Sequence, residues 1–424
     1  MTITDTHSAY EREPLIRPFG FKGGYMNECW QVVTMLENER GQHAIGLATQ
    51  NVLWSDAAVF IRYGEQQGNT LMVALLNYAL GLVRGQEFAS PMQLFETIWP
   101  QVYEYGKILT GLPDLQETFA LNALVSLDNA AWLLYAQVNN ITNFDDLLPE
   151  QYRPAMAYKY NRLAAIPLIS YNATMDDLCE LLKQEYFFFK IKLGSPGAPE
   201  EMLEWDKQRI TQIHKLLGGL ETPYTANGAI PYYFDANGRY PDKETFLRLL
   251  DHLDQIGALA QTTLIEEPFP PDYDADVHNL GVRLAADESA HTDQHTLQRI
   301  HMGYSAIALK PIAKTLSMTL KIAAVAHKFN IPCFCADLTV NPILVEWNKN
   351  IAARLGPFPG LHIGLLETNG HQNYRNWAAM RSYHPAPNSP WAMAANGLFT
   401  LDESFYMESG GIFQLPGHYK ELVN

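Results

Sequence analysis

The sequence predicts an α/β protein in which a closed barrel of parallel strands follows a smaller α+β unit. From residue 166 to residue 367, short apolar segments alternate with longer amphipathic ones, which gives eight strand–helix units. Such a regular alternation is typical of a parallel β/α barrel. An open, doubly wound sheet would normally carry a glycine-rich phosphate loop after its first strand, and the sequence has no such loop there.

The chain before residue 160 has a different pattern. Segments 28–36 and 43–49 resemble two strands separated by turn residues, so they predict an antiparallel hairpin. The pattern between residues 71 and 147 is helical. We therefore expect three units, which are an α+β capping domain over 1–160, a catalytic barrel over 161–370, and a C-terminal segment over 371–424 that packs back on both.

Each barrel unit supplies one predicted strand, and several supply a clear helix. The strands are predicted at 167–171, 187–193, 232–235, 263–266, 283–287, 306–310, 333–337 and 362–367. The helices between them include 175–184, 199–217, 243–256, 293–301 and 317–329.

The composition excludes some classes of function. The chain has 424 residues and a formal net charge of -16, which argues against nucleic acid as the main partner, because phosphate binding needs a basic patch. The sequence shows no signal peptide, no apolar segment long enough to span a bilayer, and no zinc-binding spacing among its four cysteines. We expect a cytoplasmic protein with reduced cysteines that assembles as a homo-oligomer.

The predicted strands end on ionisable residues, and barrel active sites are built at the carboxyl ends of the strands. Three consecutive strands end in Asp235, Glu266 and Asp287. Neighbouring strands lie about 5 Å apart, so the three carboxylates can converge. They would repel one another without a cation between them, and hard oxygen ligands suit one Mg²⁺ per chain, with Mn²⁺ as the alternative. Each acid taken singly is also a common helix N-cap.

Two neighbours of these acids are expected to support the site. Side chains alternate along a strand, so only one acid of the pair Glu266 and Glu267 faces the barrel mouth. We choose Glu266 and expect Glu267 either to support the metal ligands from behind or to have a structural role. Asn237 follows Asp235 by two residues and is predicted to point toward the metal or the substrate.

Three lysines are candidates for proton transfer. Lys190 and Lys192 lie on the same face of one predicted strand, among apolar residues. Two ammonium groups in one dry pocket should lower each other's pKa, which makes a lysine a usable base. Lys310 ends the sixth strand, across the barrel mouth. The alternative is that these lysines only form salt bridges with the many acids.

These parts together indicate one kind of chemistry. A divalent cation can hold a substrate carboxylate while a lysine removes the neighbouring α-proton. The product is an enediolate, whose charge the cation and Lys190 would stabilise.

The ordered motifs K-x-K, D-x-N, E-E-P and D-E-S, followed by the strand-six lysine, resemble those of the enolase superfamily. They are closest to its muconate-lactonizing and dipeptide epimerase branch. The resemblance extends over the whole chain and implies a modified TIM (β/α)7β-type barrel with an N-terminal α+β cap. It implies that Mg²⁺ is bound by the three strand-end acids Asp235, Glu266 and Asp287. It also implies that Lys192 and Lys310 are the acid/base pair.

The same resemblance implies how the substrate is selected. Loops of the cap, at 19–26 and 49–55, should close over the substrate. Lys22, Tyr25 and Trp54 are the candidates for contacting it there.

Strands seven and eight depart from related branches. Strand seven has no histidine, unlike the mandelate racemase branch, and it ends in Asp337. Dipeptide epimerases carry D-x-D on strand eight to grip a substrate ammonium, whereas this chain has Glu367 and Asn369. All three residues are expected to contact the substrate, and Glu367 keeps one charge for an ammonium group.

Three functions remain open from the sequence. The leading one is racemisation or epimerisation of an amino-acid-like or acylated acid. The second is dehydration of a hydroxy or sugar acid through the same enediolate. The third is a barrel that has lost catalysis and only binds a metal–carboxylate ligand, and the retained lysines and acids argue against it.

Overall fold

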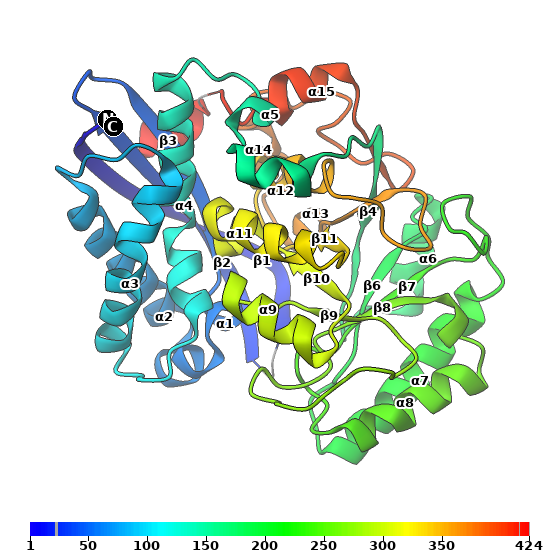
Figure 1. The fold of residues 1–424 in the computed structure, drawn as a ribbon. Coiled ribbons are helices and arrows are strands. Elements are labelled where there is room, and N and C mark those ends of the chain that lie inside the picture. Colours follow the sequence, from blue (N-terminus) through cyan, green and yellow to red (C-terminus); the bar gives the residue numbers. More distant parts are fainter. Residues whose placement is uncertain (22–23, 415, 424) are drawn as a thin grey trace.

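The computed structural model describes residues 1–21, 24–414 and 416–423. Figure 1 shows a cap, in blue to cyan, beside a larger part in green to orange that contains the barrel. The cap has an antiparallel sheet in the order β1-β2-β3, covered by helices. Its elements are β1 (Ile3–Phe21), β2 (Gly24–Asn38), β3 (His43–Gln50), α1 (Val52–Ser55), α2 (Ala57–Val83), α3 (Pro91–Thr110) and α4 (Glu117–Val138).

Strand β1 is the main cap element that the sequence pattern did not predict. It contains Pro14 and Pro18, residues that normally count against a strand because proline lacks a backbone N–H. The structure places β1 at the sheet edge, and its pairing with β2 shifts in register between Pro14 and Phe19. An edge position tolerates both prolines.

The barrel confirms the predicted fold class. Its strands are β4 (Arg162–Ile166), β5 (Leu168–Ile169), β6 (Phe189–Lys192), β7 (Tyr232–Asp235), β8 (Thr262–Glu266), β9 (Leu284–Ala286), β10 (Ala306–Leu309), β11 (Cys333–Cys335) and β12 (Gly364–Glu367). Neighbouring strands in the order β4-β12-β11-β10-β9-β8-β7-β6-β5 are parallel.

The first barrel strand closes the sheet. β4 pairs with β12 and β5 pairs with β6, and only Pro167 separates β4 from β5. The two ends of the sheet therefore belong to one interrupted strand. The predicted strand at 167–171 began too late, because the apolar run that pairs with β12 starts at Leu163.

Helices follow the strands around the barrel. They are α6 (Met175–Lys183), α7 (Pro199–Leu217), α8 (Lys243–Gln255), α9 (Asp293–Met302), α10 (Pro311–Lys314), α11 (Leu316–Lys328), α12 (Pro342–Ala352) and α13 (Gly370–Asn373). Helix α5 (Phe144–Leu147) and the 3-10 turn Glu150–Met156 connect the cap to the barrel.

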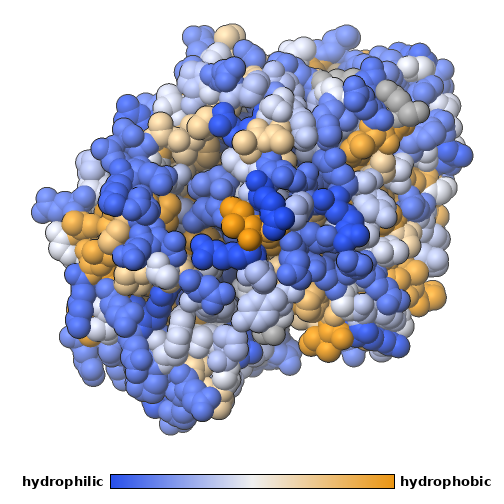
Figure 2. All heavy atoms as spheres, turned by 180° about the vertical axis from the view of Figure 1, so that it is seen from behind, coloured by the Kyte–Doolittle hydropathy of each residue, from blue (hydrophilic) through white to orange (hydrophobic). Residues whose placement is uncertain are grey.

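The chain after α13 returns to both parts. β13 (Leu398–Thr400) pairs antiparallel with β4, and α16 (Gly417–Val423) contacts β1 and β2. Helices α14 (Trp377–Ser382) and α15 (Glu403–Glu408) lie between these contacts in the sequence. Seen from behind, the surface is mostly hydrophilic, with apolar side chains in small separate groups (Figure 2). Among the described helices, none combines the length and apolar character needed to cross a membrane.

Candidate active site

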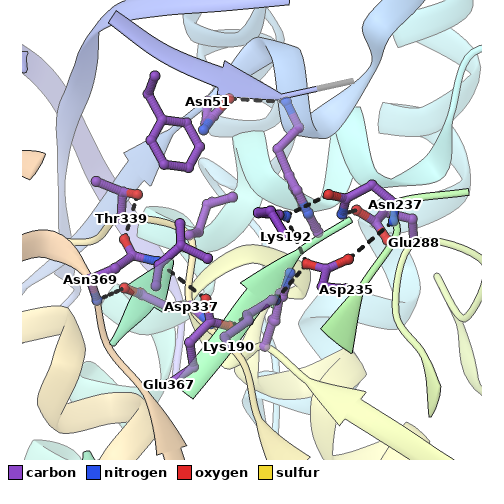
Figure 3. A pocket seen from close by; sticks show the side chains of 15 residues that line it. Asn51, Lys190, Lys192, Asp235, Asn237, Glu288, Asp337, Thr339, Glu367 and Asn369 are labelled. Carbon is purple, nitrogen blue, oxygen red and sulfur yellow. Dashed lines mark hydrogen bonds and ion pairs between the residues drawn. The ribbon is translucent and has the colours of Figure 1, made fainter. Parts of the chain in front are cut away.

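A cavity opens at the carboxyl ends of the barrel strands, beneath the cap (Figure 3). It joins residues that are far apart in the chain. Its lining residues are Phe19, Asn51, Trp54, Leu168, Lys190, Lys192, Asp235, Asn237, Glu288, Lys310, Asp337, Leu338, Thr339, Glu367 and Asn369. Most of the residues predicted from the strand ends therefore share one cavity.

The three predicted metal ligands come from neighbouring strands. Asp235 and Glu266 are the last residues of β7 and β8, and Asp287 directly follows β9. All three are fully buried. Asp235 lines the cavity, whereas Glu266 and Asp287 are not among its lining residues. Buried carboxylates without compensating charge are strongly unfavourable, so this cluster needs cations.

Lysines supply positive charge within this cluster. Lys190 Nζ lies 2.9 Å from Asp235 Oδ2, 3.1 Å from Glu266 Oε2 and 3.1 Å from Glu367 Oε2. Lys192 Nζ lies 2.7 Å from Asp235 Oδ2. The lysines and acids of adjacent strands are therefore interleaved.

The charges around Lys190 correct one expectation from the sequence. Two neighbouring lysines and burial should lower its pKa. Burial does act in that direction, but the carboxylates of Asp235, Glu266 and Glu367 outweigh it and raise the pKa of Lys190 well above the usual value. The prediction of a depressed pKa is wrong for Lys190, because the sequence did not show how many acids face the amine.

Lys310 occupies the other side of the mouth. Its Nζ donates to Asp287. Burial, the largest single influence, lowers the pKa of Lys310, but the charges of nearby acids, chiefly Asp287, together raise it above the usual value. Lys314, one helical turn further along, was not predicted as a site residue. Its Nζ lies 3.1 Å from Asp287 Oδ1 and donates to the Asp287 carbonyl oxygen at 2.7 Å. Asp287 is thus held from two sides.

Glu288 is a second residue that the sequence analysis missed. Carboxylate oxygens of Glu266, Asp287 and Glu288 lie within 4.8 Å of one another, and this group does not include Asp235. Glu288 Oε1 also accepts a hydrogen bond from Asn237 Nδ2 at 3.0 Å. Its position directly after Asp287 was the available signal.

Glu266 and Glu267 have different roles, because β8 ends at Glu266 and Glu267 has a φ of 41°, outside the strand conformation. Glu266 faces Lys190, and the Tyr233 hydroxyl donates to it. Glu267 turns away, and its Oε2 accepts from the backbone N–H groups of Asp287, at 2.8 Å, and Ser289, at 3.0 Å. Glu267 thereby holds the loop that carries Asp287.

Acids and amides at the ends of β11 and β12, and in the loops that follow, form the opposite wall of the cavity (Figure 3). The backbone N–H of Asp337 donates to Glu367 Oε2 at 2.9 Å, and that of Asn369 donates to Asp337 Oδ2 at 2.8 Å. Asn369 Nδ2 donates to Glu367 Oε1 at 3.2 Å. Burial, and then the Glu367 charge, raise the pKa of Asp337 to about 7.

The cap contributes three described residues to the cavity. Trp54 is buried, and its ring centroid lies 4.8 Å from Lys310 Nζ. Phe19 and Asn51 also line the cavity, within the loop regions expected from the sequence. Tyr25 does not line it, because this residue near the start of β2 points to solvent and is 54% exposed. Lys22 lies outside the described residues.

The fold and these residues define a class of protein, a β/α barrel with a polar site at the strand ends under a separate cap. Residues 174–359 match the family model described as enolase C-terminal domain-like. A comparison with curated protein sequences found no match.

Solved structures with the same fold cover nearly the whole chain. A mandelate racemase/muconate lactonizing protein from Herpetosiphon aurantiacus is 17% identical, with a TM-score of 0.66 and coverage of 95% of this chain and 96% of that one. The N-succinyl Arg/Lys racemase from Bacillus cereus ATCC 14579 is 16% identical, with a TM-score of 0.64 and coverage of 88% and 89%. The dipeptide epimerase from Enterococcus faecalis V583, complexed with Mg and L-Leu-L-Tyr, is 16% identical, with a TM-score of 0.60 and coverage of 88% and 100%.

The predicted resemblance is thereby confirmed. Residues 174–359 are similar to the enolase C-terminal domain-like family, and nearly the whole chain has the fold of these solved structures.

Proposed function

We propose that this protein is a Mg²⁺-dependent racemase or epimerase of an amino-acid-like or acylated acid, which acts by abstracting the α-proton to give an enediolate. The placement of Lys192 and Lys310 carries this proposal. Lys192 ends β6 and Lys310 follows β10, and three strands, β7 to β9, separate these two strands in the barrel. The lysines therefore approach the mouth from opposite sides. A substrate carbon between them has one amine on each face, as 1,1-proton transfer requires.

The fully buried acids Asp235, Glu266 and Asp287 would hold the Mg²⁺. Their carboxylate oxygens are the hard ligands that this ion prefers. When bound, the ion supplies positive charge that stabilises the negative charge developing on the substrate carboxylate. The fold relative from Enterococcus faecalis, which was solved with Mg, supports this choice of ion.

The other residues of the cavity have roles that follow from their surroundings. Lys190 Nζ lies among the strand-end acids and offers a second positive charge to the enediolate. Trp54 covers Lys310 from the cap, which keeps water from that side of the amine.

The far wall of the cavity favours a substrate that carries an ammonium group. Asp337 is 6% exposed and lies against Glu367. Among the ion pairs found between described residues, none includes Asp337, whereas Glu367 pairs with Lys190. A substrate ammonium beside Asp337 would compensate this buried carboxyl group. The arrangement supports amino-acid-like acids over sugar acids.

Proton exchange in D₂O tests the proposal. The protein with Mg²⁺ is incubated with a panel of acylated amino acids, dipeptides and sugar acids, and the α-proton is followed by NMR. We expect the signal of an amino-acid-like acid to disappear as its stereoisomer forms. Lys192→Ala and Lys310→Ala should each stop interconversion but retain exchange from one stereoisomer, because each variant keeps a base on one face. Lys183→Ala, with a side chain 69% exposed on α6, is the control.

Other outcomes separate the alternatives. A keto-acid product would identify dehydration of a hydroxy acid instead. Binding of Mg²⁺ without exchange from any acid of the panel would favour the binding-only protein. Loss of exchange from both stereoisomers in both lysine variants would contradict the two-base arrangement.

A further inference from the structure

A second group of side chains that could bind a metal ion lies between the cap and the barrel, outside the cavity. It consists of Glu117, the first residue of α4, with His291 in the loop after β9 and His295 in the first turn of α9. His295 Nδ1 lies 3.2 Å and His291 Nδ1 lies 3.9 Å from Glu117 Oε2. One ligand atom from each residue falls within 4.8 Å of the others.

The hydrogen bonding of Glu117 indicates that these three side chains are not fully explained as a salt bridge. Its Oε2 atom is buried and accepts no hydrogen bond from any described residue, although His295 Nδ1 is close. The two imidazole rings are T-shaped, at 81° and 5.5 Å between centroids. Both Nδ1 atoms lie near the same carboxylate oxygen of Glu117. A buried carboxylate oxygen in this position lacks the hydrogen bond that normally offsets its desolvation.

The spacing suits a tetrahedral transition-metal ion. Ligands about 2.0–2.2 Å from Zn²⁺ lie roughly 3.3 Å from one another. The separation of His295 Nδ1 from Glu117 Oε2 is 3.2 Å, and that of His291 Nδ1 is longer, at 3.9 Å, so His291 would move closer to the ion. Two imidazoles and one carboxylate form a ligand set that zinc sites use with water in the fourth position. This nitrogen-rich set differs from the all-oxygen set at the strand ends, which suits Mg²⁺.

We propose that Glu117, His291 and His295 bind one Zn²⁺ or a similar divalent transition-metal ion. The ion ties α4 of the cap to the loop and helix that follow β9. That loop begins with Asp287, four residues before His291, so the ion also fixes the segment that carries a strand-end acid. The site is independent of the proposed reaction.

Zinc titration of the full chain tests this site. The protein is stripped with a chelator, saturated with Mg²⁺ and titrated with Zn²⁺ by calorimetry, and Co²⁺ absorption reports the coordination geometry. We expect one Zn²⁺ per chain and the visible bands of tetrahedral Co²⁺. His295→Ala should weaken Zn²⁺ binding by about 10- to 100-fold, and Glu117→Gln should also weaken it. His301→Ala, which removes an exposed histidine of the same helix, is the matched control.

The comparison of the variants with the wild type decides whether these residues bind zinc. Neither the calorimetry nor the Co²⁺ absorption requires enzyme activity. His295 has a side chain 37% exposed, so its replacement by alanine should not unfold the protein. Equal zinc affinity in the wild type, His295→Ala and Glu117→Gln would overturn the proposal. An octahedral Co²⁺ spectrum that persists in both variants would also overturn it, because the ion would then be bound elsewhere.

Discussion

Asp206 shows how a single buried residue prepares the site. It lies on α7 and accepts hydrogen bonds from the backbone N–H of Gly194, at 3.0 and 2.9 Å, and from the Tyr240 hydroxyl, at 2.6 Å. Gly194 has a φ of 74°, a conformation that residues with a side chain rarely adopt. The carboxylate therefore fixes the turn two residues after Lys192, and with it the end of β6.

The pKa of Asp206 predicts a pH dependence of stability. Burial raises this pKa to about 7 from the ordinary value of 3.8. Below the ordinary value the residue is protonated in both the folded and the unfolded chain. Between these two values the unfolded chain releases its proton first, so a rise in pH lowers the free energy of unfolding, and the loss is complete above the folded pKa. Asp206→Asn should remove this contribution.

Thermal unfolding of both proteins measures the effect. The wild type should be more stable relative to Asp206→Asn at pH 5 than at pH 8. Asp251→Asn, at an exposed position of α8, provides the control. A difference between the wild type and Asp206→Asn that does not change with pH would contradict the assignment.

At the scale of elements, the sequence predicts segments that are bounded by clear signals. β7 and α7 have the predicted bounds, because the apolar run before Asp235 is short and Pro199 opens an amphipathic segment. β1 escaped prediction because edge strands tolerate proline and a weak apolar pattern. Several strands of the structure end one or two residues before their predicted ends, because the chain leaves the sheet just before the loops that carry the site.

The sequence predicts the site residues that lie at the end of a strand. The strand-end lysines and acids share a face by alternation and by the parallel register of the barrel. Lys314 and Glu288 escaped prediction because their positions depend on the path of the chain after a strand has ended. The contacts of Lys190 also depend on side-chain packing across several strands, which sequence spacing alone does not determine.

The junction of α4 with α11 yields a prediction about two elements. Asp128 of α4 accepts hydrogen bonds from the N–H of Ser317, at 3.0 Å, and from its hydroxyl, at 2.5 Å, and Trp132 Nε1 donates to Ser317 Oγ at 3.0 Å. Asp128→Ala should destabilise the protein by about 1–3 kcal/mol, because it leaves buried donors of Ser317 without their acceptor. Denaturant unfolding measures this loss.

Two further variants show whether the loss of stability comes from the hydrogen bonds of Asp128. Asp128→Asn keeps one acceptor oxygen and should lose less stability than Asp128→Ala. Asp251→Ala at the exposed position of α8 should change little. If Asp128→Ala is no less stable than Asp251→Ala, these hydrogen bonds do not join the cap to the barrel.

At the scale of the whole molecule, the barrel centre concentrates opposite charges in a protein with an acidic balance of -16. The charged residues that meet there are Lys190, Lys192, Lys310, Lys314, Asp235, Glu266, Asp287, Glu288 and Glu367. The acids outnumber the lysines in this set. The proposed divalent cation should therefore stabilise the entire barrel when it binds.

Removal of one central lysine tests this linkage. Without Mg²⁺, Lys190→Met should destabilise the protein by about 3–5 kcal/mol, because it leaves buried carboxylates without their cation. Added Mg²⁺ should raise the unfolding temperature of Lys190→Met more than that of the wild type, since the ion replaces the lost positive charge. Calorimetry with and without Mg²⁺ measures both shifts, with Lys183→Met as the surface control. An equal shift in all three proteins would show that Mg²⁺ binds away from the acids around Lys190.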